Sequence, residues 1–449
     1  MKFEHIALQV PEIYLPCKGV DLTSWAVVAC DQYTSQPEYW ENVRELIGTS
    51  PSTLNLILPE VYLEADSKEQ MIQSINSTMR EYLDQGILTP EKPGFILLNR
   101  KNSSGISRKG LIVALDLEQY DYSKGAQTLI RATEGTILER LPPRIQVREN
   151  APLELPHIMV LIDDPDKTVI EPLFDKKNQK VYDVPLMMNS GHIQGYKIED
   201  EATIREVAAS LGRLADLETY SRKYNVSRKS VLLYALGDGN HSFATAKVIW
   251  ENLKKASGSE KEIMHHPARY VLVELVNVHD EGLEFEPIHR VVFNINTKKM
   301  IQGMESFFRQ AGSVFSCKTY ETRQDLEHEA RELQTENTHL IPFIAEKNYG
   351  LLIIKKPVLN LEVATLQAFF DTHMKENPSL KIDYIHGTDA VTALGSQQNN
   401  IGFYLPAISK HSFFKTIILD GALPRKTFSM GEADDKRFYL ECRRITKPE

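Results

Sequence analysis

The sequence predicts a mixed α/β fold, in the sense of α+β, with mixed sheets and additional subdomains. Short apolar runs bounded by turn residues alternate with amphipathic stretches of helical period along the chain. The clearest case is 230–256, SVLLYALGDGNHSFATAKVIWENLKKA, which predicts a buried strand, a turn with two glycines and an amphipathic helix. Alternation of this kind favours helices packed against a sheet.

The length of the chain, 449 residues, predicts two or three domains, because single cores seldom grow beyond about 250 to 300 residues. We expect an N-terminal mixed α+β domain over residues 1–200. A strand-turn-helix α/β domain over 201–296 carries the GDGNHS motif. A C-terminal α/β subdomain over 297–449 is expected to close onto the core.

One helix stands out in the first domain, over residues 67–85. Its apolar side chains repeat every four residues between a serine and a glycine, which is typical of a helix that packs on a core, and they are Met71, Ile75, Met79 and Leu83. Strands are expected at 95–99, 111–115, 158–162 and 169–173.

The later elements follow the same reasoning. Residues 201–226 are predicted to be helical, and Asn240 or Ser242 is expected to cap the helix that follows the glycine turn. Helices are expected at 300–311, 325–335 and 361–375, and strands at 269–278, 289–294, 340–345, 351–354, 413–420 and 437–443.

Composition excludes several classes of protein. The formal net charge of −9 argues against general nucleic-acid affinity, so no nucleic-acid partner is expected. The N-terminal stretch resembles neither a signal peptide nor an anchor and no apolar run reaches 18 residues, so we expect a cytoplasmic protein without membrane association. The four cysteines lack metal-ligand spacing, which predicts reduced thiols, and no structural zinc, haem or flavin is expected.

The glycine turn is a candidate anion site. The sequence has no GxxxxGK[ST], GxSxG or HExxH motif and only part of GxGxxG, so a standard P-loop or Rossmann site is not expected. A helix start still offers free amides and a positive dipole end to an anion. Asp238 is a candidate Mg²⁺ ligand or base, His241 a candidate donor, and Asn240 and Ser242 neutral donors. The alternative is an Asx-type turn in which Asn240 only caps the helix.

Four sequence blocks carry a family resemblance. They are GDGNHSFATAK, WAVVACDQYTSQPEYW at 25–40, EFEPIHRVVF at 284–293 and LPRKTFSMGEADDKRFYLE at 423–441. Together they resemble the domain of unknown function 1015 family over essentially the whole chain. In many members the turn is an aspartate-glycine-histidine-histidine-arginine box, similar to that of ParB-like free serine kinases and to the phosphate-binding turn of sulfiredoxin. The resemblance implies a ParB/sulfiredoxin-like strand-turn-helix phosphate site.

This chain departs from the family pattern at two positions of the box. Asn240 stands where the first histidine is expected, and Ser242 stands where the arginine is expected. Losing the arginine removes a guanidinium fork that could bind two phosphate oxygens.

Three further segments supply candidate residues. Glu134 and Thr136 resemble a family glutamate-x-threonine element, and Arg144 belongs to a group of four arginines at 131–148 that could replace the missing guanidinium, although such arginines are more often solvated surface. His289 and Arg290 open a strand, where the family match favours a site over simple packing. Asp31 follows the apolar AVVAC run and could deliver a carboxylate into a cleft or lie in a strand-end turn.

Through the resemblance, these features predict an enzyme that handles a phosphorylated small molecule. The leading interpretation is a kinase-like phosphotransferase that uses a nucleotide, ATP or ADP, with Mg²⁺, and acts on serine or a similar hydroxyl metabolite. The alternatives are a phosphatase acting on the same substrate class and a non-catalytic nucleotide or metabolite sensor. The expected partners are a metabolite, a nucleotide and, as an option, a second copy in a homodimer.

The expected site residues fall into two groups. The catalytic group comprises Asp238, His241, Glu134 and Asp31. The substrate-binding or phosphate-binding group comprises Gly237, Gly239, Asn240, Ser242, Thr136, Arg144, His289 and Arg290.

Overall fold

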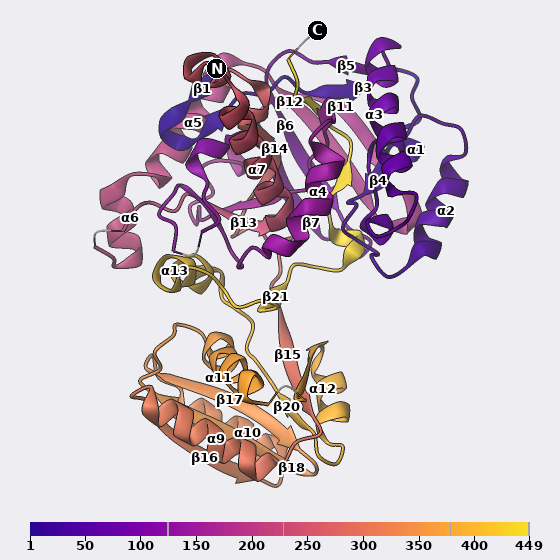
Figure 1. Ribbon diagram of the computed structural model, residues 1–449. Helices are drawn as coiled ribbons and strands as arrows, with labels where there is room; N and C mark the ends of the chain where they lie inside the picture. The colour runs from indigo at the N-terminus through magenta and orange to yellow at the C-terminus, as the bar shows by residue number, and fades with distance from the viewer. Residues whose placement is uncertain (124, 228, 378, 448–449) are drawn as a thin grey trace. The chain divides into compact units, whose positions relative to one another are not determined.

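The computed structural model describes residues 1–123, 125–227, 229–377 and 379–447 (Figure 1). The chain forms two compact units, of which the first comprises Met1–Leu283 with Gly431–Glu449 and the second comprises Glu284–Met430. The second unit is therefore an insertion into the sequence of the first. The expected boundary at residue 200 falls inside the first unit, and strands from both sides of it share one sheet.

The first unit is built on one large mixed sheet, which confirms the predicted fold class. Its strands lie in the order β11-β12-β6-β7-β14-β10-β13-β8, and β2 pairs with β7 and β1. The pairs β10–β14 and β8–β13 are parallel, whereas the other neighbours are antiparallel. The strands are β1 (Lys2–Phe3), β2 (Leu8–Gln9), β6 (Phe95–Lys101), β7 (Ser107–Asp116), β8 (Ile130–Ala132), β10 (Met159–Ile162), β11 (Gln179–Pro185), β12 (His192–Ile198), β13 (Tyr234–Asp238) and β14 (Tyr270–Asn277).

Helices cover both faces of this sheet. Successive side chains of a strand point to opposite faces, and in this sheet the side chains on both faces are apolar. Leu97, Leu111 and Val113 belong to one apolar core, whereas their neighbours Ile96 and Ile112 belong to the other. The first core includes side chains of α5 and α7, and the second includes side chains of α2 and α3. The helices are α1 (Leu22–Trp25), α2 (Pro37–Ile47), α3 (Lys68–Asp84), α4 (Leu141–Arg148), α5 (Glu201–Leu214), α6 (Leu217–Tyr224), α7 (Asn240–Ala256) and α8 (Glu260–Ile263).

The C-terminal segment returns to the first unit and is fixed there by two short strand pairs. β22 (Phe438–Tyr439) pairs with β4 (Val27–Val28), and β23 (Arg443–Arg444) pairs with β9 (Leu153–Glu154). A third small pair joins β3 (Tyr14–Pro16) to β5 (Leu88–Pro90). Residues far apart in the sequence are thus brought together beside the main sheet.

The second unit has its own antiparallel sheet, in the order β16-β18-β17-β20-β15-β19, with β21 paired to β15. Its strands are β15 (Glu286–Phe293), β16 (Val314–Tyr320), β17 (Thr338–Ala345), β18 (Asn348–Lys355), β19 (Lys381–His386), β20 (Ile401–Phe403) and β21 (Phe428–Ser429). Its helices are α9 (Thr297–Gln310), α10 (Arg323–Leu333), α11 (Glu362–Glu376), α12 (Thr388–Gly395) and α13 (Lys410–Asp420).

Four expected elements differ in the structure. The strand expected over 437–443 is two short strands, β22 and β23, which pair with β4 and β9. The segment 413–420, read as a strand from its apolar and β-branched residues, is part of α13, because the Ser409 hydroxyl accepts the Ser412 amide at one end and Gly421 adopts a left-handed conformation at the other. Residues 169–173 are not a strand, since a 3₁₀ helix spans Glu171–Asp175. The expected helix over 201–226 is two helices, with Asp216 capping the second through the Thr219 amide.

None of the described helices combines the length and apolar character that crossing a membrane requires.

A buried network of charges holds the C-terminal segment against the main sheet. Glu274, in the middle of β14, pairs with Arg108 Nη2 at 3.3 Å and with Arg437 Nη1 at 3.1 Å. Arg437 also binds Glu441, and its Nε donates to the Pro156 carbonyl at 2.7 Å. Gly110 leaves room for Glu274, because a Cβ there would lie 2.6 Å from Oε1.

We expect Glu274→Gln to lower the free energy of unfolding of the first unit by about 3 kcal/mol, because two buried guanidinium groups lose their shared counter-charge. Tryptophan fluorescence in a urea titration measures the change in this unit alone, since Trp25, Trp40 and Trp250 all lie in it. The matched control is Glu201→Gln, which breaks the exposed pair with Arg205 and should change the value by less than about 0.5 kcal/mol. Equal effects of the two substitutions would contradict the assigned role of Glu274.

Candidate functional site

Three chain segments meet at one edge of the main sheet. β8 and β13 are parallel neighbours, with Ala132 opposite Leu236, so the segments that follow them leave the sheet side by side. β10 runs antiparallel to β13 with Met159 opposite Asp238, which places the residues before β10 at the same edge. The glycine turn, the loop after β8 and the segment before β10 therefore form one cluster.

The turn between β13 and α7 depends on Gly239. This residue has a φ of 78° and is the N-cap of α7, and a Cβ on it would lie 3.0 Å from Ile158 Cα. The expected capping by Asn240 or Ser242 is wrong, because in the described chain no side chain hydrogen-bonds as a cap at this helix start. The amides of the first helical turn thus lack intrahelical partners and carry the positive end of the helix dipole. Gly237 precedes the turn as part of β13.

Asp238 is held by two neighbours. Its Oδ1 accepts the Gly239 amide at 2.9 Å, and its Oδ2 lies 3.2 Å from Lys436 Nζ. Burial opposes ionisation of this carboxyl, but the charge and hydrogen bond of Lys436, the Gly239 amide and the charge of His157 hold its pKa below the usual range. Asp238 is therefore an ionised carboxylate at neutral pH.

The arrangement around Asp238 does not fit the expected Mg²⁺ ligand. An ammonium group already lies where a cation would approach Oδ2, and Oδ1 already accepts the Gly239 amide. Within the described residues, no three His, Cys, Asp or Glu side chains are grouped so that they could hold a metal ion. Lys436 thus supplies a positive charge beside Asp238 Oδ2.

His241 is a neutral ring facing the loop after β8. Its Nε2 accepts the Ile137 amide at 3.4 Å, so the proton of the neutral ring lies on Nδ1. Burial first, and then the positive charges of Arg144 and Arg140, lower the pKa of His241 to about 4. At neutral pH this side chain can donate one hydrogen bond but carries no positive charge.

Asn240 links the turn to the neighbouring loop. Its Nδ2 donates to the Thr133 hydroxyl at 3.4 Å, and that hydroxyl donates to the Leu236 carbonyl at 2.6 Å. The Oδ1 atom of Asn240 is buried and accepts no hydrogen bond from the part of the chain that the structure describes. Glu134 and Thr136, partly buried, lie on the same loop. The structure thus brings the glutamate-x-threonine element beside the turn.

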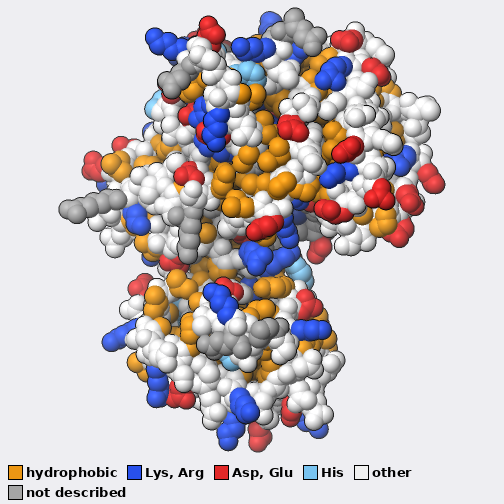
Figure 2. Space-filling model, in the orientation of Figure 1, with side chains coloured by type: hydrophobic (Ala, Val, Ile, Leu, Met, Phe, Trp, Pro, Cys, Tyr) orange, Lys and Arg blue, Asp and Glu red, His pale blue; other side chains and the backbone are white. Residues whose placement is uncertain are grey.

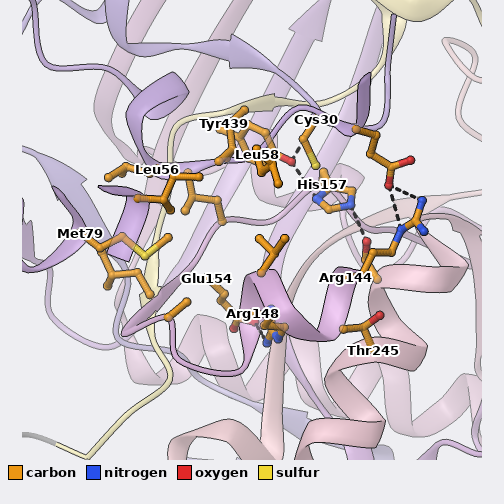
Figure 3. Close-up of a pocket in the computed structure, with 18 of the residues that line it drawn as sticks. Cys30, Leu56, Leu58, Met79, Arg144, Arg148, Glu154, His157, Thr245 and Tyr439 are labelled. Atoms are coloured by element: carbon orange, nitrogen blue, oxygen red, sulfur yellow. Dashed lines mark hydrogen bonds and ion pairs between the residues drawn. The ribbon is translucent and has the colours of Figure 1, made fainter. Parts of the chain in front are cut away.

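Arg144, on α4, lines the same pocket as Ser242 (Figure 3). Its Nε and Nη2 both bind Glu60 Oε1, at 2.9 and 2.5 Å. Its replacement of the missing guanidinium stays a prediction, and Glu60 already balances its charge. A phosphate that binds Arg144 would have to displace the Glu60 carboxylate or bind the guanidinium beside it.

Two residues that the sequence did not single out connect to Ser242. The Ser242 hydroxyl lies 2.8 Å from His157 Nε2, and His157 Nδ1 lies 2.9 Å from the Tyr439 hydroxyl (Figure 3). The Tyr439 oxygen also accepts the Cys30 amide at 3.1 Å. We call this hydrogen-bonded chain of Ser242, His157 and Tyr439 the relay. The only signal in the sequence was the family block that contains Tyr439.

Asp31 lies close to the relay but does not line the pocket. Its Oδ1 accepts Gln32 Nε2 at 2.9 Å, and its charge is among the influences that, after burial, raise the pKa of the Tyr439 phenol. Asp31 follows β4 and is adjacent to Cys30, whose amide binds Tyr439, while its catalytic role stays a prediction.

His289 and Arg290 belong to the second unit, where their polar atoms bind local backbone. His289 Nδ1 accepts the Leu405 amide at 3.0 Å, and burial followed by the charges of Arg290 and His386 lowers its pKa to about 4. Arg290 is fully buried and donates to the carbonyls of Lys426 and Arg425. The glycine turn belongs to the first unit, so a shared site with these two residues stays a prediction.

The model of the family described as protein of unknown function (DUF1015) matches residues 14–373. The chain belongs to this family. No curated protein matches it significantly.

Several solved structures are similar to this chain. A free serine kinase variant in complex with AMP has 9% identity and a TM-score of 0.38, covering 75% of this chain and 91% of its own. A conserved hypothetical protein from Pyrococcus furiosus has 11% identity and a TM-score of 0.35, with 73% and 93% covered. C-terminally truncated SbnI from Staphylococcus aureus has 10% identity and a TM-score of 0.32, with 71% and 83% covered.

We expect the ring of His241 to remain neutral from pH 8 to pH 5 and to titrate with a midpoint near 4, because burial and two arginines disfavour its charged form. Histidine ring signals in a proton–carbon NMR titration measure this, and His241→Gln identifies the signal by its loss. The pKa of a histidine in an unfolded chain is about 6.5. The unfolded chain therefore takes up the proton first, and the stability due to His241 falls as the pH drops from 6.5 to 4. A midpoint near 6.5 would contradict the burial of this ring.

Proposed function

We propose that this protein binds the phosphate groups of a nucleotide at the turn between β13 and α7 and transfers a phosphoryl group to a small hydroxyl metabolite. The observation that carries the proposal is the uncapped first turn of α7, which follows a glycine that no larger residue can replace without strain. Unpaired amides at such a turn favour an anion.

The surroundings of the turn add donors and positive charge. His241 keeps a proton on Nδ1, Lys436 lies beside Asp238, and the charges of Arg140 and Arg144 act on His241. Phosphoryl transfer depends chiefly on positioning and on neutralising charge, so fixed donors and cations of this kind supply what the reaction needs. The resemblance of the turn to the box of free serine kinases points to the same chemistry.

We assign Glu134 to orienting the acceptor hydroxyl. Its loop leaves the sheet beside the turn, and Asn240 and His241 both hydrogen-bond to that loop. The buried Oδ1 of Asn240 accepts nothing from the described residues, so a hydroxyl or amino group of the nucleotide is a suitable donor for it. Asp238 has a positioning role in this proposal, because it holds the Gly239 amide and Lys436.

Asn240→Asp tests the nucleotide site. A negative charge on the first turn of α7 should weaken ATP and ADP binding at least about tenfold, or 1.4 kcal/mol, because it repels phosphate. The same charge suits a helix N-terminus, so we expect the fold to persist. Isothermal titration calorimetry measures the affinities, and Asn225→Asp, at the exposed end of α6, is the control of equal charge. Unchanged affinity in Asn240→Asp, or no nucleotide binding by the wild-type protein, would refute the site.

Turnover distinguishes the proposal from its two alternatives. Phosphorus NMR of the protein with ATP and hydroxyl metabolites should show a new phosphoester and ADP, and Glu134→Gln should slow their formation at least about tenfold. Release of phosphate from a phosphoester without nucleotide would indicate the phosphatase. Nucleotide binding without turnover of any kind would indicate the sensor.

A further inference from the structure

A pocket of about 120 Å³ lies in the first unit next to the relay (Figure 3). Most of its wall is aliphatic and comes from α3, α4 and the segments around residues 54–63 and 151–155, including Leu56, Leu58 and Met79. Its size is near the ~150 Å³ of an engineered apolar cavity that binds benzene. Hydrophobic side chains also gather on the outer face over α4 and α7, which pack against each other (Figures 1 and 2).

One end of the pocket carries the relay. Both ring nitrogens of His157 are engaged, one by Ser242 and one by Tyr439. A serine hydroxyl has one donor and two acceptor positions, so Ser242 Oγ can form a further hydrogen bond with a ligand while it keeps His157. The Thr245 hydroxyl also lines the pocket, but its proton is already donated to the His241 carbonyl at 2.8 Å. The relay thus holds the Ser242 hydroxyl at one end of a mainly apolar pocket.

The charged side chains that line the pocket are neutralised by the protein itself. Glu60 pairs with Arg144, and Glu154 pairs with both Arg148 and Arg443. Burial raises the pKa of the Cys30 thiol, so this group is uncharged as well. A ligand with its own charges would lose hydration here and meet counter-ions that are already paired, which is unfavourable.

We propose that this pocket is the acceptor site of the reaction and that it takes an uncharged alcohol with a compact aliphatic or aromatic body. The hydroxyl binds Ser242 Oγ and the apolar body lies against Leu56, Leu58 and Met79. Ser242 belongs both to this pocket and to the first turn of α7, so the bound hydroxyl lies beside the proposed phosphate site. The acceptor role rests on the proposed function, but alcohol binding does not need it.

Binding of benzyl alcohol, toluene and serine to the full chain tests the substrate class without nucleotide. Saturation-transfer NMR and calorimetry should show saturable binding of benzyl alcohol and none of serine. Ser242→Ala should weaken benzyl alcohol about fivefold, because one hydrogen bond is lost, and leave toluene within about twofold. Ser257→Ala, at the far end of α7, is the control and should change neither ligand. Met79→Trp should abolish binding of both by filling the chamber.

The possible outcomes separate this proposal from the proposed function. Saturable alcohol binding that depends on Ser242 supports the pocket, and alcohol-dependent consumption of ATP supports its acceptor role. Alcohol binding without ATP consumption, while nucleotide still binds, leaves the alcohol site standing and overturns phosphoryl transfer to it. Absence of saturable alcohol binding, tighter binding of serine, or equal weakening of toluene by Ser242→Ala overturns the pocket. If Met79→Trp does not fold, Ser242→Ala decides.

Discussion

The salt bridge between Arg437 and Glu274 is the interaction on which the candidate site depends. Arg437 is buried against the main sheet and fixes the segment that also carries Lys436 and Tyr439. Lys436 reaches Asp238, and Tyr439 reaches His157. Arg437 further binds the carbonyl of the residue before His157, so one guanidinium positions both ends of that hydrogen bond. Without it, Asp238 would lose Lys436 and His157 would lose Tyr439, whereas Asn240 and His241 bind the loop after β8 and do not depend on this segment.

Much of the fold follows from local patterns in the sequence. The helix expected over 67–85 is α3, and the strand-turn-helix at 230–256 is β13 and α7, because periodicity and bounding glycines act over a few residues. The strand predicted over 413–420 is wrong because the β-branched residues of this segment suit a strand as well as a buried helix. Only the serine cap and the packing select the helix. The two-unit division was not predictable from local patterns, because it depends on where the last segment returns.

Part of the candidate site could likewise be predicted from local sequence patterns, and part could not. The residues of the turn and the glutamate-x-threonine element are within short motifs, and the parallel pairing of β8 with β13 brings the two motifs together. His157 was missed because no motif contains it, and Lys436 and Tyr439 were missed because the family block that contains them does not indicate which of its residues reach the site. Ser242 and His157 are 85 positions apart in the sequence, and His157 and Tyr439 are 282 apart, so only the tertiary structure could reveal the relay.

The order of the two units along the chain has a consequence for biosynthesis. The second unit is contiguous and can fold as soon as its own residues have emerged from the ribosome. The first unit begins earlier but is completed later. The partners of β4, β9 and the Glu274 carboxylate are β22, β23 and Arg437, which are translated after the whole insertion. Until then Glu274 is a charge in a sheet without one of its counter-ions, and Asp238 lacks Lys436. The protein therefore acquires its candidate site only after the whole second unit has been translated and the segment from Gly431 has followed it.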